Sequence, residues 1–101
     1  MTDNPDVALV VTHPNGRPHC AVRGEIDIVT APTVGQALTS FIDIGETAID
    51  LDLSQVEFID SRGIHELIVA RRAGLRITIT DASSAVRRAL DVAGINGYLS
   101  E

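Results

Sequence analysis

Four short stretches of the chain have the apolar content and the alternation that are typical of β-strands. They cover residues 7–12, 19–24, 48–54 and 75–80. In the third stretch, AIDLDLS, strict alternation predicts that Ile49, Leu51 and Leu53 face one side of a sheet and Asp50 and Asp52 the other. The first two stretches are separated by HPNGRP, whose proline, asparagine and glycine favour a turn and therefore predict an antiparallel hairpin.

Three further stretches carry apolar residues at the spacing of amphipathic helices. The first covers residues 30–45, can be capped by Thr30 or Thr33, and has a proline in its first turn, where proline is tolerated. The second covers residues 64–74 and has two arginines in its last turn, where cations suit the helix dipole. The third covers residues 83–94, and each helix is expected to end at a glycine: Gly45, Gly74 and Gly94.

The predicted order of elements, β-β-α-β-α-β-α, indicates an α/β fold. A hairpin followed by two right-handed crossovers produces a small mixed sheet of four strands with the helices packed on one face. A chain of 101 residues fits a single domain that spans residues 1–101. We expect the core to contain the inward-facing apolar residues of this fold: Leu51, Leu53, Phe58, Ile64, Leu67, Ile68, Val86 and Leu90.

Composition and charge narrow the classes of function. A net charge of −6, a pI near 4.8 and the absence of lysine argue against a nucleic-acid-binding surface. Cys20 is the only cysteine, which excludes an intrachain disulfide and a cysteine-based metal site, and we expect it to be a small core residue. No window approaches the roughly 18 apolar residues of a membrane span, and the acidic N-terminus has no signal-type apolar stretch. We therefore expect a soluble, cytoplasmic protein.

The segment FIDSRGIH, residues 58–65, places a serine between an acid and an arginine where a helix begins. A nucleophilic serine needs a base, and His65 lies four residues after Ser61, but DSRG is not the G-x-S-x-G motif of a nucleophile elbow. A weak magnesium contact by Asp27 and Asp60 is another alternative, although no loop resembles a calcium motif. A P-loop is excluded, because the chain has no lysine.

Ser61 itself has two interpretations that the residues alone leave open. One is a helix cap, worth about 1 kcal/mol. Asp60 can fill that role equally well, which leaves Ser61 free to carry a phosphate. A phosphate there would meet free backbone N–H groups and the positive end of the helix dipole. It would also add about −1.5 to −2 charge beside Asp60 and Asp27, so Ser61 could be both modified and recognised by a partner.

Three segments of the chain resemble the STAS family, and most closely its bacterial anti-sigma factor antagonists. They are RGEIDIVTAP (23–32), LDLSQVEFIDSRGIHEL (51–67) and SSAVRRALDVAGI (83–95). They occur in the family's order and spacing and cover nearly the whole chain. The resemblance implies a small mixed sheet with helices on one side. It also implies a protein that is not an enzyme, that needs no cofactor or metal, and that acts by binding another protein.

In that family, the serine directly after the aspartate of this motif is phosphorylated by a partner that is both anti-sigma factor and serine kinase. Ser61 stands at this position. Unphosphorylated antagonists bind the anti-sigma factor, which releases the sigma factor, whereas phosphorylated antagonists dissociate. By this resemblance, the partner-binding surface combines the GEID segment with the rim of the second helix: Asp27, Asp60, Ser61, Arg62, Gly63, His65 and Glu66.

Two residues depart from the family's pattern. The family usually has serine or threonine where this chain has Arg62, and commonly a small residue where it has His65. Both residues belong to the expected partner face, so they bear on the identity of the partner and on the efficiency of phosphorylation rather than on the fold. The resemblance also allows an alternative function, that of a STAS subunit in a bacterial lipid-transport ABC system, where it would bind the cytoplasmic ATPase.

Overall fold

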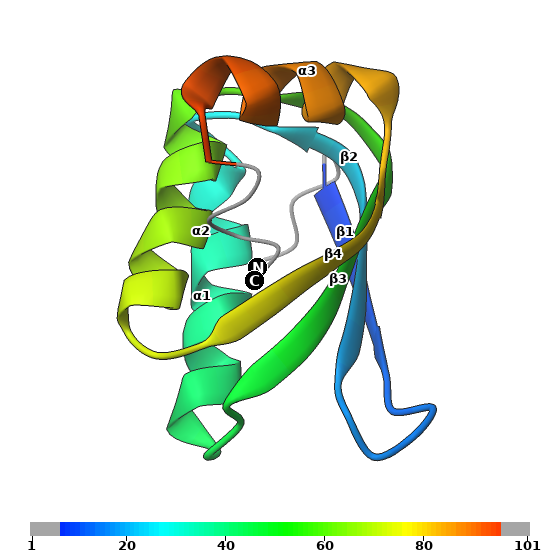
Figure 1. Cartoon of the computed structure of the whole chain (residues 1–101), viewed down its shortest axis with the longest axis vertical. Helices are drawn as coiled ribbons and strands as arrows, with labels where there is room; N and C mark the ends of the chain where they lie inside the picture. The colour runs from blue at the N-terminus through cyan, green and yellow to red at the C-terminus, as the bar shows by residue number, and fades with distance from the viewer. Residues whose placement is uncertain (1–6, 96–101) are drawn as a thin grey trace.

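The computed structural model describes residues 7–95, which form a four-stranded sheet covered by three helices (Figure 1). The order of elements is the one predicted. The elements are β1 (Val7–Thr12), β2 (His19–Ile26), α1 (Ala31–Asp43), β3 (Ala48–Ile59), α2 (Ser61–Arg72), β4 (Arg76–Ala82) and α3 (Ser84–Ala93).

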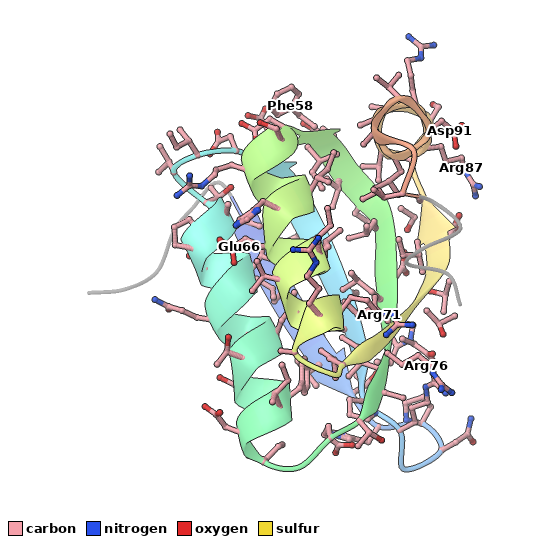
Figure 2. The ribbon with its side chains drawn as sticks, turned by 60° about the vertical axis from the view of Figure 1, so that its left-hand side comes forward. Phe58, Glu66, Arg71, Arg76, Arg87 and Asp91 are labelled. Carbon is pink, nitrogen blue, oxygen red and sulfur yellow. The ribbon has the colours of Figure 1, made fainter. Side chains whose placement is uncertain are left out.

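The sheet has the strand order β1-β2-β3-β4. β1 and β2 form the predicted antiparallel hairpin, while β2 with β3 and β3 with β4 pair in parallel. The parallel pairs are joined by α1 and α2, which lie side by side against the sheet (Figures 1 and 2). α3 follows β4 and crosses the end of the sheet formed by β3 and β4. The predicted mixed sheet with its helical layer is confirmed.

The alternation in β3 separates a buried face from a polar one. Ile49, Leu51 and Leu53 are at most 1% exposed and belong to one continuous core with the apolar residues of the helices. Asp50 and Asp52 lie half-buried on the opposite face. On the core side, Leu67 of α2 and Val86 and Leu90 of α3 are buried as predicted.

β3 is longer and less regular than the sequence indicates. It continues to Ile59, whereas the predicted strand ended at residue 54, and it twice contains an extra residue relative to β2. Each extra residue shifts the alternation by one position. Val56 and Ile59 are therefore buried, while Phe58 is 47% exposed. The prediction that Phe58 lies in the core is wrong.

The helices differ from the prediction mainly at their starts. α2 begins at Ser61, three residues earlier than the predicted start at residue 64, and its Ile64 and Ile68 are half-buried rather than fully inside. At the other end of each helix the predicted glycines are confirmed, since Gly45, Gly74 and Gly94 all have positive φ, a conformation that L side chains rarely adopt.

Cys20 is a core residue, as predicted. Its side chain is fully buried in β2, and burial raises the pKa of the thiol to about 11, so the sulfur stays protonated. Within residues 7–95, no helix is both long and apolar enough to cross a membrane.

The core position of Leu67 predicts a clear effect on stability. Leu67→Ala should lower the free energy of unfolding by about 2–5 kcal/mol, because it leaves a cavity under α2. Val69→Ala in the same helix is the matched control, since Val69 is 46% exposed, and it should change stability by less than about 1 kcal/mol. Urea denaturation followed by circular dichroism measures both variants in one cooperative transition. Equal losses for Leu67→Ala and Val69→Ala would contradict this description of the core.

Candidate functional site

The start of α2 is capped by Asp60, the residue between the end of β3 and the helix. Its Oδ1 accepts hydrogen bonds from the backbone N–H groups of Arg62 at 2.9 Å and Gly63 at 3.2 Å. These bonds satisfy N–H groups that have no partner within the helix. Ser61 is the first residue of α2, is exposed, and takes no part in the cap. Of the two interpretations of Ser61, the cap is therefore wrong, and among residues 7–95 its hydroxyl has no hydrogen-bond partner.

Gly63 brings the first turn of α2 against the ends of two strands. A Cβ atom at this position would lie 2.6 Å from Cγ2 of Ile26 and 2.8 Å from Cγ1 of Ile59. Both isoleucines are buried, and neither contact atom is the far end of a flexible side chain. Gly63 is itself buried, so its role in the structure is close packing beneath the exposed Ser61 rather than a place on the surface.

The loop that follows β2 leaves the sheet beside the start of α2. Ile26 and Ile59 are paired in the parallel ladder, and the backbone N–H of Asp60 donates to the carbonyl of Ile26 at 3.1 Å. Asp27 and Asp60 are the next residues along their two strands, so the two aspartates leave the same edge of the sheet as neighbours. The structure thus brings the GEID segment next to the segment that carries Ser61.

Asp27 organises this loop through its carboxylate. Oδ1 accepts hydrogen bonds from the backbone N–H groups of Val29 at 2.9 Å and Thr30 at 3.0 Å. The hydrogen bond from the backbone of Thr30 has the largest effect, and together these bonds lower the pKa of Asp27 below its usual value, because they stabilise the ionised form. A negative charge at Asp27 is therefore a permanent feature of the site at neutral pH.

Thr30 occupies the predicted cap position of α1 but does not cap the helix. Its hydroxyl instead donates to the carbonyl of Glu25 at 2.7 Å and accepts the backbone N–H of Asp27 at 2.8 Å. Its side chain is fully buried. Of the two predicted cap residues, Thr30 and Thr33, Thr30 takes the N-cap position, but the predicted side-chain cap is wrong, because its hydroxyl closes the loop instead.

The other predicted site residues of α2 fall into two groups. Arg62 and His65 are exposed, with Ser61, on the outer side of the helix start. Glu66 is half-buried and turned toward α1 (Figure 2), where a Cβ on Gly35 would lie 2.8 Å from the Cδ atom of Glu66. Glu66 thus belongs to the contact between the two helices.

Across residues 7–95, no hydrogen bond joins His65 to Ser61, and no group of three or more His, Cys, Asp or Glu side chains could hold a metal ion. Asp50 lies on the polar face of the sheet, where Arg17 pairs with it at 3.0 Å. The carboxylates of β3 are therefore separate from those of Asp27 and Asp60.

Exposed apolar side chains that the sequence pattern does not predict surround the start of α2. Ile28 and Val29, in the loop after β2, are 67% and 66% exposed. Phe58 is 47% exposed at the end of β3, and Val92 of α3 is 85% exposed. For Ile28 and Val29 the sequence does contain a signal of exposure, since they follow Asp27 directly and belong to no apolar periodicity. For Phe58 the sequence contains no such signal, because the bulges in β3 that turn its side chain outward cannot be read from the residues alone.

A groove of about 470 Å³ lies between α2 and α3. Its surface is mostly apolar, and Ser61 stands in its wall on the α2 side. The groove is lined by Phe58, Ile59, Asp60, Ser61 and Ile64 on one side and by Ala85, Arg88, Ala89, Val92 and Ala93 of α3 on the other.

Comparison with known proteins identifies relatives of this chain. A protein-family model described as "Mlab, STAS domain" matches residues 9–101. The anti-sigma-F factor antagonist RsfB of Mycobacterium tuberculosis is 28% identical over 99 residues, which cover 95% of this chain and 81% of RsfB. A solved anti-sigma factor antagonist from Mycobacterium paratuberculosis has a TM-score of 0.80 at 29% identity, covering 95% of this chain and 86% of its own. Unphosphorylated SpoIIAA, at 18% identity, shares the fold with a TM-score of 0.74 over 90% of this chain and 84% of its own.

The tight fit of Gly63 predicts the effect of one added methyl group. Gly63→Ala should lower the free energy of unfolding by about 1–3 kcal/mol, because overpacking against two buried isoleucines outweighs the better helix propensity of alanine. Arg62→Ala is the matched control one residue earlier. Its side chain is exposed, so the change should stay within about 0.5 kcal/mol. Chemical denaturation of both variants checks this, and a Gly63→Ala variant as stable as the parent would show that α2 does not need this close approach.

Proposed function

The chain belongs to the STAS domain family, and on that premise we propose that it is an anti-sigma factor antagonist switched by phosphorylation of Ser61. In this proposal the unphosphorylated chain binds an anti-sigma factor that is also a serine kinase, and phosphorylation releases it. The observation that carries the proposal is that the cap of α2 and its first exposed hydroxyl belong to two different residues. Asp60 makes the cap, and Ser61 is left exposed at the helix N-terminus. The names of RsfB and of the mycobacterial antagonist support it.

The chemical step belongs to the kinase. The Ser61 hydroxyl oxygen would form a bond to the γ-phosphorus of ATP while the bond to the bridging oxygen of ADP breaks, and a base of the kinase would accept the hydroxyl proton. This chain supplies only the acceptor oxygen, so it is not the enzyme of the reaction. Since such partners act on transcription, we propose that the chain works in the cytoplasm.

The exposed apolar side chains around Ser61 suit a docking surface. Ile28, Val29 and Phe58 surround the helix start and would lose contact with water in a complex, which favours association. We define the docking surface by the loop of residues 27–30, the segment of residues 58–65 and the groove between α2 and α3. Its predicted polar members are Asp27, Asp60, Ser61, Arg62 and His65, with Gly63 as the packed residue beneath them. Glu66, turned toward α1, would lie at its edge.

A phosphate on Ser61 would change the charge of this surface. It adds about −2 next to the carboxylates of Asp27 and Asp60. Arg62 is adjacent in sequence and supplies one positive charge, which by itself leaves about one negative charge of the phosphate uncompensated. Neighbouring residues at a helix start also do not face each other, and an exposed ion pair contributes only about 0.2–1 kcal/mol. Arg62 is therefore too weak a counter-charge to cancel the effect of the phosphate.

The proposal predicts where the phosphate goes and what it does. Incubation of the chain with each anti-sigma factor kinase encoded in the source genome, together with ATP, should place one phosphate on Ser61 as located by mass spectrometry. Ser61→Asp should weaken binding of that kinase at least about 10-fold in calorimetry, because even one charge opposes burial of the docking surface.

Ser84 provides a matched control for this experiment. It is likewise exposed at the first position of a helix whose cap is made by the preceding residue, Ser83, which accepts the N–H of Val86 at 3.2 Å. Ser84→Asp should leave the affinity unchanged. Phosphate found only on Ser54, Ser83 or Ser84, or equal binding by the parent and Ser61→Asp, would contradict the proposal. Tight binding to the ATPase of a lipid-transport ABC system, and to none of the kinases, would favour the alternative function.

A further inference from the structure

The groove between α2 and α3 has one basic residue in its lining, Arg88. On α3, Ala85, Arg88, Ala89 and Val92 recur at the spacing that places residues on one helix face, and all four line the groove. Ser61 lines the opposite wall from the start of α2. Ser61, the proposed site of phosphorylation, and the guanidinium group of Arg88 thus line the same groove from two different helices.

Arg88 differs from its neighbour Arg87 in its contacts. Arg87 donates from Nη2 to Oδ1 of Asp81 at 3.2 Å and from Nε to the carbonyl of Ala82 at 3.0 Å. Figure 2 shows Arg87 on the side of α3 that faces away from α2. In the part of the chain from residue 7 to residue 95, Arg88 has no salt bridge and its side chain makes no hydrogen bond. Its charge is therefore available for a new partner.

We propose that Arg88 binds the phosphate of phosphorylated Ser61 across the groove, and that this ion pair covers the apolar surface on which the partner docks. The inference rests on the proposed function, because it requires a phosphate on Ser61. A guanidinium group can donate two parallel hydrogen bonds to phosphate oxygens, and its aliphatic stem packs along apolar walls such as those of Ala89 and Val92. The apolar walls also reduce the screening of the ion pair by water.

This arrangement gives the modification a second effect besides its charge. While Ser61 is unmodified, the groove is open, and the Arg88 guanidinium is available to donate hydrogen bonds to a carboxylate of the partner. Once Ser61 carries a phosphate, the guanidinium of Arg88 is paired with that phosphate, and the ion pair spans the opening of the groove. Release then follows from local competition for Arg88, without any change in the fold.

The experiment uses the full-length chain with phosphoserine inserted at position 61 during translation, so that no kinase is needed. Phosphorus NMR as a function of pH gives the second pKa of this phosphate, which is about 6 for an ordinary phosphoserine. The negative charges of Asp27 and Asp60 would raise this pKa, whereas the positive charge of Arg62 and the helix N-terminus would lower it, and the proposed ion pair with Arg88 would lower it further. We expect a lower pKa in the parent than in Arg88→Gln, and the parent value in the matched control Arg87→Gln.

Equal phosphate pKa values in the parent and in Arg88→Gln would overturn the inference. A pKa that rises in Arg62→Gln but not in Arg88→Gln would also overturn it, because the counter-charge would then be the residue adjacent to Ser61. The result is separable from the proposed function. Failure of every anti-sigma factor kinase to modify Ser61 would refute that function, whereas this comparison depends only on the installed phosphate.

Discussion

The close approach of the first turn of α2 to the ends of β2 and β3 is the constraint on which the candidate site depends. Gly63 permits it, because any side chain there would collide with Ile26 and Ile59. The bond from the N–H of Asp60 to the carbonyl of Ile26 ties the same point to the neighbouring strand. With the helix start held in this way, Asp60 caps it and Ser61 is left exposed, and no hydrogen bond within residues 7–95 uses its hydroxyl.

The same edge of the sheet concentrates the chemistry of the surface. Parallel pairing of Ile26 with Ile59 makes the loop of Asp27 a neighbour of Ser61, and the hydrogen bonds from Val29 and Thr30 keep the Asp27 carboxylate ionised. Around these charges lie exposed apolar side chains and the groove toward α3. A surface that combines apolar area with a modifiable hydroxyl can bind a protein in one state and repel it in the other. This is the physical basis for the proposed switch.

The sequence was informative wherever short-range patterns dominate. The alternation of Ile49, Leu51 and Leu53 predicts the buried face of β3, and the sequence also identifies Asp60 and Ser61 as the two candidates for the cap of α2. Bulges in β3 escaped prediction because they depend on pairing with β2, so Phe58 was wrongly placed in the core. The sequence offers Thr30 or Thr33 as the cap of α1, and it does not reveal that the Thr30 hydroxyl bonds across the preceding loop instead of to the helix. No sequence pattern singles out Arg88, because only the tertiary fold brings α3 to the groove that Ser61 also lines.

The most direct test of the account is a map of the partner-binding surface in solution. Amide chemical shifts of the unphosphorylated, isotopically labelled chain should be recorded during titration with the anti-sigma factor kinase that phosphorylates it. We predict that the largest changes fall in residues 27–30, in residues 58–65 and on the groove face of α3, and that they disappear when Ser61 carries a phosphate. Changes centred instead on β1 and the polar face of the sheet would contradict the claim that the start of α2 is the docking site.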